Sequence, residues 1–332
     1  METRNEKKLN KELPVVIGKD LAQARFTMSL WERRLLYVAM SKLNANDTVF
    51  PEITFSLADM AKLLDENKFS GAENEAIKEA AHKLVSRTVE VSEKGKFEIY
   101  PWVTYFKLEQ TKAGNMITME FNSRLAPHLL YMLENKGYTK FLLKYALPLG
   151  SVYAQRCYEM FRALIYEAQP RAVQTIALME FRRKLDIADD KYKGYNMLKK
   201  RVLETAERDI NQKTDIFIKF SEIKGRGKGG RIESLHVSVI LKTHMIHEYD
   251  RYLVWQKDDL LDKLQTVAMS KKGHQINTRA LSEFAHESIA RLLYEVVSEK
   301  MDLSGINSCE KFFDYTLSQW ATDIGMNQIS ME

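Results

Sequence analysis

The sequence contains the same supersecondary unit twice, and this internal duplication constrains the fold more than any other feature. Each half runs in the order helix, short β-type segment, two helices and β-hairpin. Matching residues keep the same spacing from the short strand through the next helix: Thr54, Leu57, Leu64 and Asp65 in the first half, and Thr175, Leu178, Leu185 and Asp186 in the second. A chain of 332 residues is also long enough for two domains with separate cores.

The match resumes after a short insertion, in the longer helix of each half, at Ile77, Leu84, Arg87 and Thr88 and at Leu203, Ile210, Lys213 and Thr214. Each of these helices leads into a β-type segment. This is the order of a winged helix-turn-helix, whose second close helix enters a DNA major groove while the hairpin lies on phosphates. The sequence therefore predicts a helix-rich α+β fold of two tandem winged helix-turn-helix domains with a C-terminal helical extension.

Changes in the pattern along the chain predict the domain boundaries. We expect a polar N-terminal tail at 1–24, a first winged-helix domain at 25–146, a second at 147–247 and a helical extension at 248–332. The first helix is expected over Phe26–Leu43 with Thr27 or Ser29 as its cap, and a long strand over Phe97–Leu108.

Composition excludes several classes of protein. With 45% hydrophobic and 29% charged residues, the chain is neither disordered nor fibrous. Its two cysteines, Cys157 and Cys309, are too few for a disulfide framework or a thiolate zinc site, which favours a reducing cytoplasm. No stretch approaches the roughly 18 apolar residues of a membrane span, so we expect a cytoplasmic protein with no membrane partner.

Positive charge clusters on the helix expected over Tyr195–Asn211. At 100° per residue, Leu198, Val202 and Ile210 define its buried side. Four cations are expected to contact DNA. Lys200, Arg201 and Arg208 lie on the opposite side of the helix, and Lys213 follows its end. Ammonium and guanidinium groups on an exposed helix suit guanine edges and phosphates, although a solvated face would look the same. The angle of Lys199 lies towards the apolar side.

The corresponding helix of the first half has a less basic exposed face. Its candidate DNA-binding residues are Lys78, His82, Lys83 and Arg87. We therefore expect the first domain to supply backbone contacts or dimerisation, and the second domain to carry most of the sequence readout.

A glycine-rich basic run spans residues 224–231. A nucleotide-binding loop needs a helix after it, whereas this run leads into a β-type segment. We expect a basic wing on the DNA backbone, with a merely mobile loop as the alternative, and the candidate contacts are Arg226, Lys228 and Arg231.

Residues with catalytic or metal-binding chemistry are sparse. His244, His247, Glu248 and Asp250 do not have a known zinc-protease spacing, so we expect no metal and no cofactor. Walker, nucleophile-elbow and kinase motifs are absent from the sequence, and no two histidines have the His-hydrophobic-His spacing of DNA-nicking initiators. We therefore expect a binding protein and not an enzyme.

Taken together, these segments resemble the Rep3 superfamily of plasmid replication initiators over about Leu21–Leu241. The resemblance is carried by Trp31-Glu32-Arg33-Arg34-Leu35 within the first helix, by Leu149–Phe161, and by Arg201–Thr214 before Lys224-Gly225-Arg226. It aligns Lys199-Lys200-Arg201 with the basic recognition segment of the family. It does not cover the C-terminal helices.

The resemblance implies binding of double-stranded DNA at direct repeats (iterons) and at an operator. It implies origin melting with a host initiator, a replicative helicase and chaperones, and autorepression by a homodimer in equilibrium with the monomer. We expect the dimer surface in the hairpin Phe97–Phe121, on Tyr100, Trp102, Tyr105 and Phe106, although these rings could instead fill the domain core. The alternatives are a repressor without initiator activity and a DNA-nicking enzyme.

Overall fold

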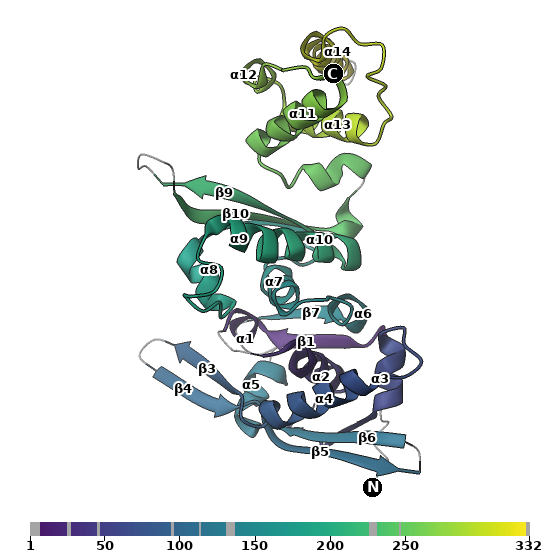
Figure 1. Cartoon of the computed structure of the whole chain (residues 1–332), viewed down its shortest axis with the longest axis vertical. Helices are drawn as coiled ribbons and strands as arrows, with labels where there is room; N and C mark the ends of the chain where they lie inside the picture. Colours follow the sequence, from purple (N-terminus) through teal and green to yellow (C-terminus); the bar gives the residue numbers. More distant parts are fainter. Residues whose placement is uncertain are drawn as a thin grey trace. The chain divides into compact units, whose positions relative to one another are not determined.

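The computed structural model describes residues 7–24, 28–44, 47–93, 96–112, 114–130, 137–225, 231–245 and 247–329. These residues divide into two units. The first unit comprises residues 1–169, 176–216 and 224–234, and the second comprises residues 170–175, 217–223 and 235–332. Figure 1 labels the helices and strands.

The first half of the duplication has the predicted order of elements. Helix α2 (Leu30–Ser41) begins at Ser29, whose hydroxyl accepts a hydrogen bond from the Glu32 amide. Strand β2 (Ile53–Ser56), helix α3 (Leu57–Leu63) and helix α4 (Gly71–Leu84) follow, and a capping box of Ser70 and Glu73 starts α4. Strands β5 (Val103–Thr111) and β6 (Gly114–Phe121) complete an antiparallel sheet in the order β2-β6-β5. The winged-helix prediction is confirmed for this half.

The long strand expected over Phe97–Leu108 is divided in two at Trp102. Strand β4 (Lys96–Pro101) pairs with β3 (Thr88–Glu93), whereas β5 pairs with β6. Trp102 is 1% exposed, its amide donates to the Arg87 carbonyl at 3.0 Å, and its carbonyl accepts from the Asn122 amide at 3.0 Å. The buried indole thus fixes the point where the chain passes from one hairpin to the next.

The N-terminal segment is not the polar tail expected for residues 1–24. Strand β1 (Pro14–Gly18) pairs antiparallel with β7 (Tyr138–Leu142), and helix α1 (Lys19–Gln23) follows it. Val15, Leu21 and Ala22 are fully buried. The apolar run at residues 15–17 is therefore part of the first core. Short helices α5 (Ala126–Leu129) and α6 (Leu143–Ala146) flank β7.

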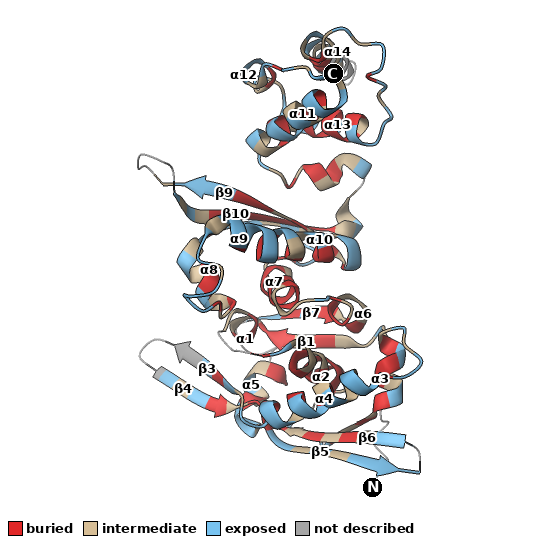
Figure 2. Cartoon of the chain, in the orientation of Figure 1, coloured by how far each residue is buried: buried red, intermediate tan, exposed pale blue. Residues whose placement is uncertain are grey.

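The second half repeats the order of the first. Helix α7 (Val152–Arg162), strand β8 (Arg171–Ala177) and helix α8 (Leu178–Lys184) come first. The helical segment 195–213 follows; it corresponds to α4, and we call α4 and this segment the first and second recognition helices. Strands β9 (Ile216–Lys224) and β10 (Ile232–Leu241) complete the half. The sheet order is β8-β10-β9. Figure 2 shows α2 and α7 as the largely buried first helices of the two halves.

The duplication is visible in backbone geometry as well as in sequence. Helices α3 and α8 both end at an aspartate in the left-handed region, Asp65 with φ 62° and Asp186 with φ 50°. In each case the amide of this aspartate donates to the carbonyl of the residue three positions earlier. The amide of the next residue donates to the carbonyl of the residue five positions before it. This is a Schellman motif with aspartate where glycine is usual. Matching residues therefore make the same helix end twice.

The C-terminal extension forms its own apolar core within the second unit. It comprises a 3-10 turn (Glu248–Tyr252) and helices α11 (Lys257–Lys272), α12 (Thr278–Leu281), α13 (His286–Val297) and α14 (Cys309–Ile329). Leu264, Leu293 and Phe313 are fully buried in that core. In the described part of the chain, no helix combines the length and apolar character needed to cross a membrane.

The extension also contacts the second sheet inside the same unit. The Lys219 ammonium on β9 lies 4.0 Å from the centre of the Trp255 ring, and the Gln256 amide lies 2.6 Å from the His236 ring on β10. Ser221 on β9 donates to the Asp259 carboxylate. The part of the chain after residue 247 therefore supports the strands that lead to the second wing.

Candidate nucleic-acid interface

The turn before the second recognition helix is held by a buried arginine that the sequence did not single out. Arg182 on α8 is 9% exposed, and its guanidinium donates to three carbonyl oxygens of the following loop. The acceptors are Ala188 at 3.0 Å, Lys191 at 2.7 Å and Tyr192 at 3.1 Å. Because one planar group satisfies three backbone acceptors, it fixes the loop that positions the next helix.

The recognition helix is not one continuous α-helix over Tyr195–Asn211, as expected. It consists of α9 (Tyr195–Leu198), a π-helical turn (Lys199–Leu203) and α10 (Glu204–Lys213). The Thr205 hydroxyl donates to the Lys200 carbonyl at 3.2 Å, five residues back, in register with the wider turn. A π turn places an extra residue in the helix and shifts the phase of every side chain around it.

This phase shift exposes three consecutive cations. Lys199, Lys200 and Arg201 are all exposed between the buried residues Leu198 and Val202. In a regular α-helix, Lys199 would lie on the buried side, which is why its angle argued against a DNA contact. The π turn therefore brings all three predicted residues to one exposed segment.

The other two predicted cations of this helix share their charge with Asp209. The Arg208 guanidinium lies 3.4 Å from one carboxylate oxygen, and the Lys213 ammonium lies 3.8 Å from the other. Lys213 also donates to the Pro148 carbonyl at 3.2 Å. Lys213 thus ties the end of α10 to the chain before α7, which weakens its role as a free DNA contact.

The base of the second wing lies next to the helix-turn-helix. Arg231 is exposed, and its carbonyl accepts a hydrogen bond from the Gly225 amide at 2.9 Å, which closes the hairpin. An open hollow of about 290 Å³ is lined by Arg231 together with Met179, Lys193 and Tyr195. Arg226 and Lys228, the other two predicted wing residues, lie outside the described residues.

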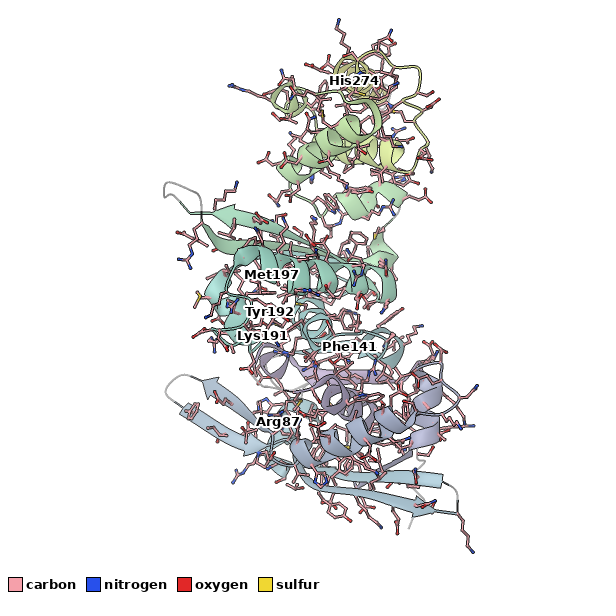
Figure 3. The ribbon with its side chains drawn as sticks, viewed as in Figure 1. Arg87, Phe141, Lys191, Tyr192, Met197 and His274 are labelled. Atoms are coloured by element: carbon pink, nitrogen blue, oxygen red, sulfur yellow. The ribbon has the colours of Figure 1, made fainter. Side chains whose placement is uncertain are left out.

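A lysine packed between two tyrosines extends this positive surface. The Lys191 ammonium lies 5.7 Å from the ring centre of Tyr153 and 5.4 Å from that of Tyr192. A hydrogen bond with the Tyr153 hydroxyl raises the pKa of Lys191 above its ordinary value, so this lysine holds its proton more firmly. Figure 3 labels Lys191, Tyr192 and Met197.

The first recognition helix has a much weaker electrostatic surface. On α4, Lys78 pairs with Glu75 at 2.7 Å, and Lys83 pairs with Glu79. His82 is exposed on the same helix. The two lysines predicted to contact DNA are therefore neutralised within their own helix.

Arg87 has a structural role. Its guanidinium lies 2.9 Å from the carboxylate of Glu32, which is fully buried on α2 (Figure 3). If Arg87 moved to contact DNA, the buried Glu32 carboxylate would lose its cation, which is unfavourable. The structure therefore does not support the prediction of a DNA contact for Arg87.

The aromatic surface predicted for dimerisation is only partly present. Tyr100 and Trp102 are buried, so these two rings fill the domain core, as the alternative interpretation stated. Tyr105 is 42% exposed and Phe106 is half-buried. Two exposed apolar residues that the prediction did not single out, Phe97 and Ile99, lie on β4, in the hairpin that precedes the one carrying Tyr105 and Phe106.

Within the described ranges, no three His, Cys, Asp or Glu side chains gather closely enough to hold a metal ion. His247 and Asp250, two of the residues considered above, instead form a capping arrangement at a 3-10 turn.

Two winged helices, the second with an exposed basic recognition helix, define a DNA-binding protein of the helix-turn-helix class. The family model of the first winged helix of initiator replication proteins matches residues 14–162, and that of the second winged helix matches residues 177–239. The chain therefore belongs to the Rep3 family of initiator replication proteins.

Several solved structures are similar to the chain in fold. The crystal structure of Pi initiator protein in complex with iteron DNA matches with a TM-score of 0.59 and 18% sequence identity, over 70% of this chain and 99% of that chain. No curated protein is significantly similar to the chain in sequence.

Proposed function

We propose that this protein initiates plasmid replication by binding direct repeats, the iterons, at the origin. The observation that carries the proposal is the exposed run Lys199–Arg201 on the recognition helix of the second winged helix. Membership of the initiator family and the fold shared with the iteron-bound Pi initiator support it. Two winged-helix domains on one chain can bind two major-groove segments that lie about one helical turn of DNA apart.

The test is a binding titration with a fluorescent duplex that carries the direct repeat from the plasmid, against a scrambled duplex, over a range of salt concentrations. We expect tighter binding to the repeat. Affinity should fall as salt rises, and each phosphate contact should make the slope of log affinity against log salt more negative by about 0.9. Equal affinity for both duplexes would contradict specific recognition, and a flat salt dependence would contradict the role of the cations.

Point variants assign the readout to one helix. Lys200→Ala and Arg201→Ala should each cost about 1–3 kcal/mol on the repeat and much less on scrambled DNA. Lys83→Ala is the matched control, because Lys83 on α4 is already paired with Glu79. If the first two variants bind normally while His82→Ala abolishes specificity, the roles of the two domains are reversed.

We further propose that the protein acts by binding and cuts no DNA strand. The Tyr100 hydroxyl lies 3.2 Å from His128, which lies 2.7 Å from Asp20. A tyrosine, a histidine and a carboxylate in this order resemble an activated nucleophile. Burial, Glu98 and Asp20 raise the pKa of Tyr100, which is opposite to the change that activates a nucleophile. Incubation of supercoiled origin DNA with the protein and a divalent cation tests this, and relaxed circles would contradict it.

We also propose a homodimer, in equilibrium with the monomer, that represses the promoter of its own gene from an operator. The exposed side chains of Phe97 and Tyr105, at 63% and 42%, support an apolar contact on the first domain. Light scattering of the full chain should detect a dimer that Phe97→Ser weakens. A dimer unaffected by this change would place the contact elsewhere. The same family membership supports a cytoplasmic location and assembly with a host initiator, helicase and chaperones.

A further inference from the structure

The first turn of the recognition helix exposes an apolar side chain beside its cations. Met197 on α9 is 49% exposed, whereas the adjacent Leu198 is 1% exposed (Figure 3). Met197 precedes Arg201 by four residues, about one turn of this helix, so the two residues are neighbours on its surface. The exposed face is therefore not uniformly basic where the helix begins.

The position of Met197 is where helix-turn-helix proteins read bases. The N-terminal residues of a recognition helix contact base edges in the major groove. The Met197 and Leu198 amides of this first turn are already bonded, since both donate to the Gly194 carbonyl, at 3.0 and 3.2 Å. At Met197 the side chain is thus the part that can approach DNA.

The chemistry of a thioether selects one feature of the major groove. Lysine and arginine suit the O6 and N7 acceptors of guanine, whereas methionine has only a weak acceptor and a flexible apolar chain. The 5-methyl group of thymine is the apolar group that the major groove displays. Covering an exposed methionine with this methyl removes apolar surface of both partners from water.

We propose that Met197 reads the 5-methyl group of one thymine in each repeat, next to the positions contacted by Lys200 and Arg201. This inference rests on the proposed function and adds the base that this residue discriminates. Met197 is a specificity-determining residue, because the methyl group that it contacts distinguishes thymine from the other bases. Deoxyuridine in place of thymine keeps every hydrogen bond of the base pair and lacks only this methyl group.

The experiment replaces each thymine of the repeat duplex, one at a time, by deoxyuridine. For the wild-type full chain, we expect one position at which affinity falls about fourfold, the effect of one methyl group leaving an apolar contact. Met197→Ala should bind the unmodified repeat more weakly and should lose the sensitivity to deoxyuridine at that position. Met197→Leu, which keeps an apolar side chain, should retain it.

Met269→Ala is the matched control, since Met269 is 45% exposed on α11, in the C-terminal extension to which no DNA contact is assigned. It should leave the deoxyuridine profile unchanged. Thermal unfolding should be the same for both alanine variants, because both side chains are exposed.

Three results would overturn the inference. Specific binding with no effect of deoxyuridine at any position would refute this inference and leave the proposed function intact. A deoxyuridine effect that persists in Met197→Ala would show that another residue contacts the methyl group. Failure of the wild type to prefer the repeat over scrambled DNA would refute both the inference and the proposed function.

Discussion

A buried cluster of charges between α2 and α7 gives the sharpest prediction for stability. The Glu159 carboxylate lies 2.6 Å from the Arg33 guanidinium and 2.6 Å from the Arg156 guanidinium, and all three side chains are at most 3% exposed. Arg33 also donates to the Tyr37 hydroxyl at 2.6 Å, and Arg156 donates to the Ala22 and Ala24 carbonyls. The carboxylate therefore compensates two cations inside the first unit.

Glu159→Gln keeps the shape of the side chain and removes its charge. Two guanidinium groups would then remain buried with no carboxylate between them, so we expect a loss of about 3–5 kcal/mol in the free energy of unfolding. At about 2–4 °C per kcal/mol for a unit of this size, the melting temperature should fall by about 6–20 °C. Urea unfolding followed by circular dichroism measures the change.

The pH dependence provides an independent check. Burial raises the pKa of Glu159, but Arg33 and Arg156 together hold it below its ordinary value. A lowered pKa in the folded state stabilises the protein above the pKa of the unfolded chain, near 4.3, and this contribution is lost as pH falls through the folded value. The wild type should therefore lose stability in acid more steeply than Glu159→Gln does.

Glu180→Gln is the control, because Glu180 pairs with Arg183 three residues on and both side chains are more than one-third exposed. It should cost less than about 0.5 kcal/mol. Equal effects of the two variants, or a Glu159→Gln protein as stable as the wild type at neutral pH, would refute the reasoning. Replacing Arg33, Arg156 and Glu159 together by apolar residues should restore much of the loss, since no unpaired charge then remains.

The remaining predictions concern backbone positioning. Arg182→Ala removes three hydrogen bonds to loop carbonyls and should cost about 2–4 kcal/mol of stability and weaken repeat binding, and Arg182→Lys should not rescue it. Trp255→Ala should speed amide hydrogen exchange in β9, because it removes the ring beside Lys219; unchanged exchange would contradict support by the extension. Asp186→Val should cost about 1–2 kcal/mol relative to Asp186→Gly, measured by urea unfolding, because φ is 50° there.

The sequence predicted the repeated unit because its signals are local. The pairs Asp65 and Asp186, and Leu64 and Leu185, end matching helices, and the structure gives both ends the same hydrogen bonds. Helix caps such as Ser29 were also predicted from neighbouring residues. The order of elements in a winged helix could therefore be inferred before any tertiary contact was known.

Features that depend on distant contacts could not be predicted in this way. The pairing of β1 with β7 joins segments more than 100 residues apart, so its residues were assigned to a polar tail. A charged residue within a helix, such as Arg33 on α2 or Glu159 on α7, usually indicates a solvated face. Here the two helices bury these side chains against each other, and the sequence of either helix alone does not show this. The π turn at Lys199–Leu203 follows no local rule of periodicity, yet it decides which cations face outward.

The two halves have diverged in charge while keeping one architecture. In α4, Glu75 and Glu79 neutralise the lysines, whereas the π turn exposes the three cations Lys199–Arg201. The extension at 248–332 contains 14 acidic and 9 basic residues, so the net charge of +5 arises wholly before it. Because attraction to phosphate depends on local charge, the strongest field for DNA is expected around the second recognition helix.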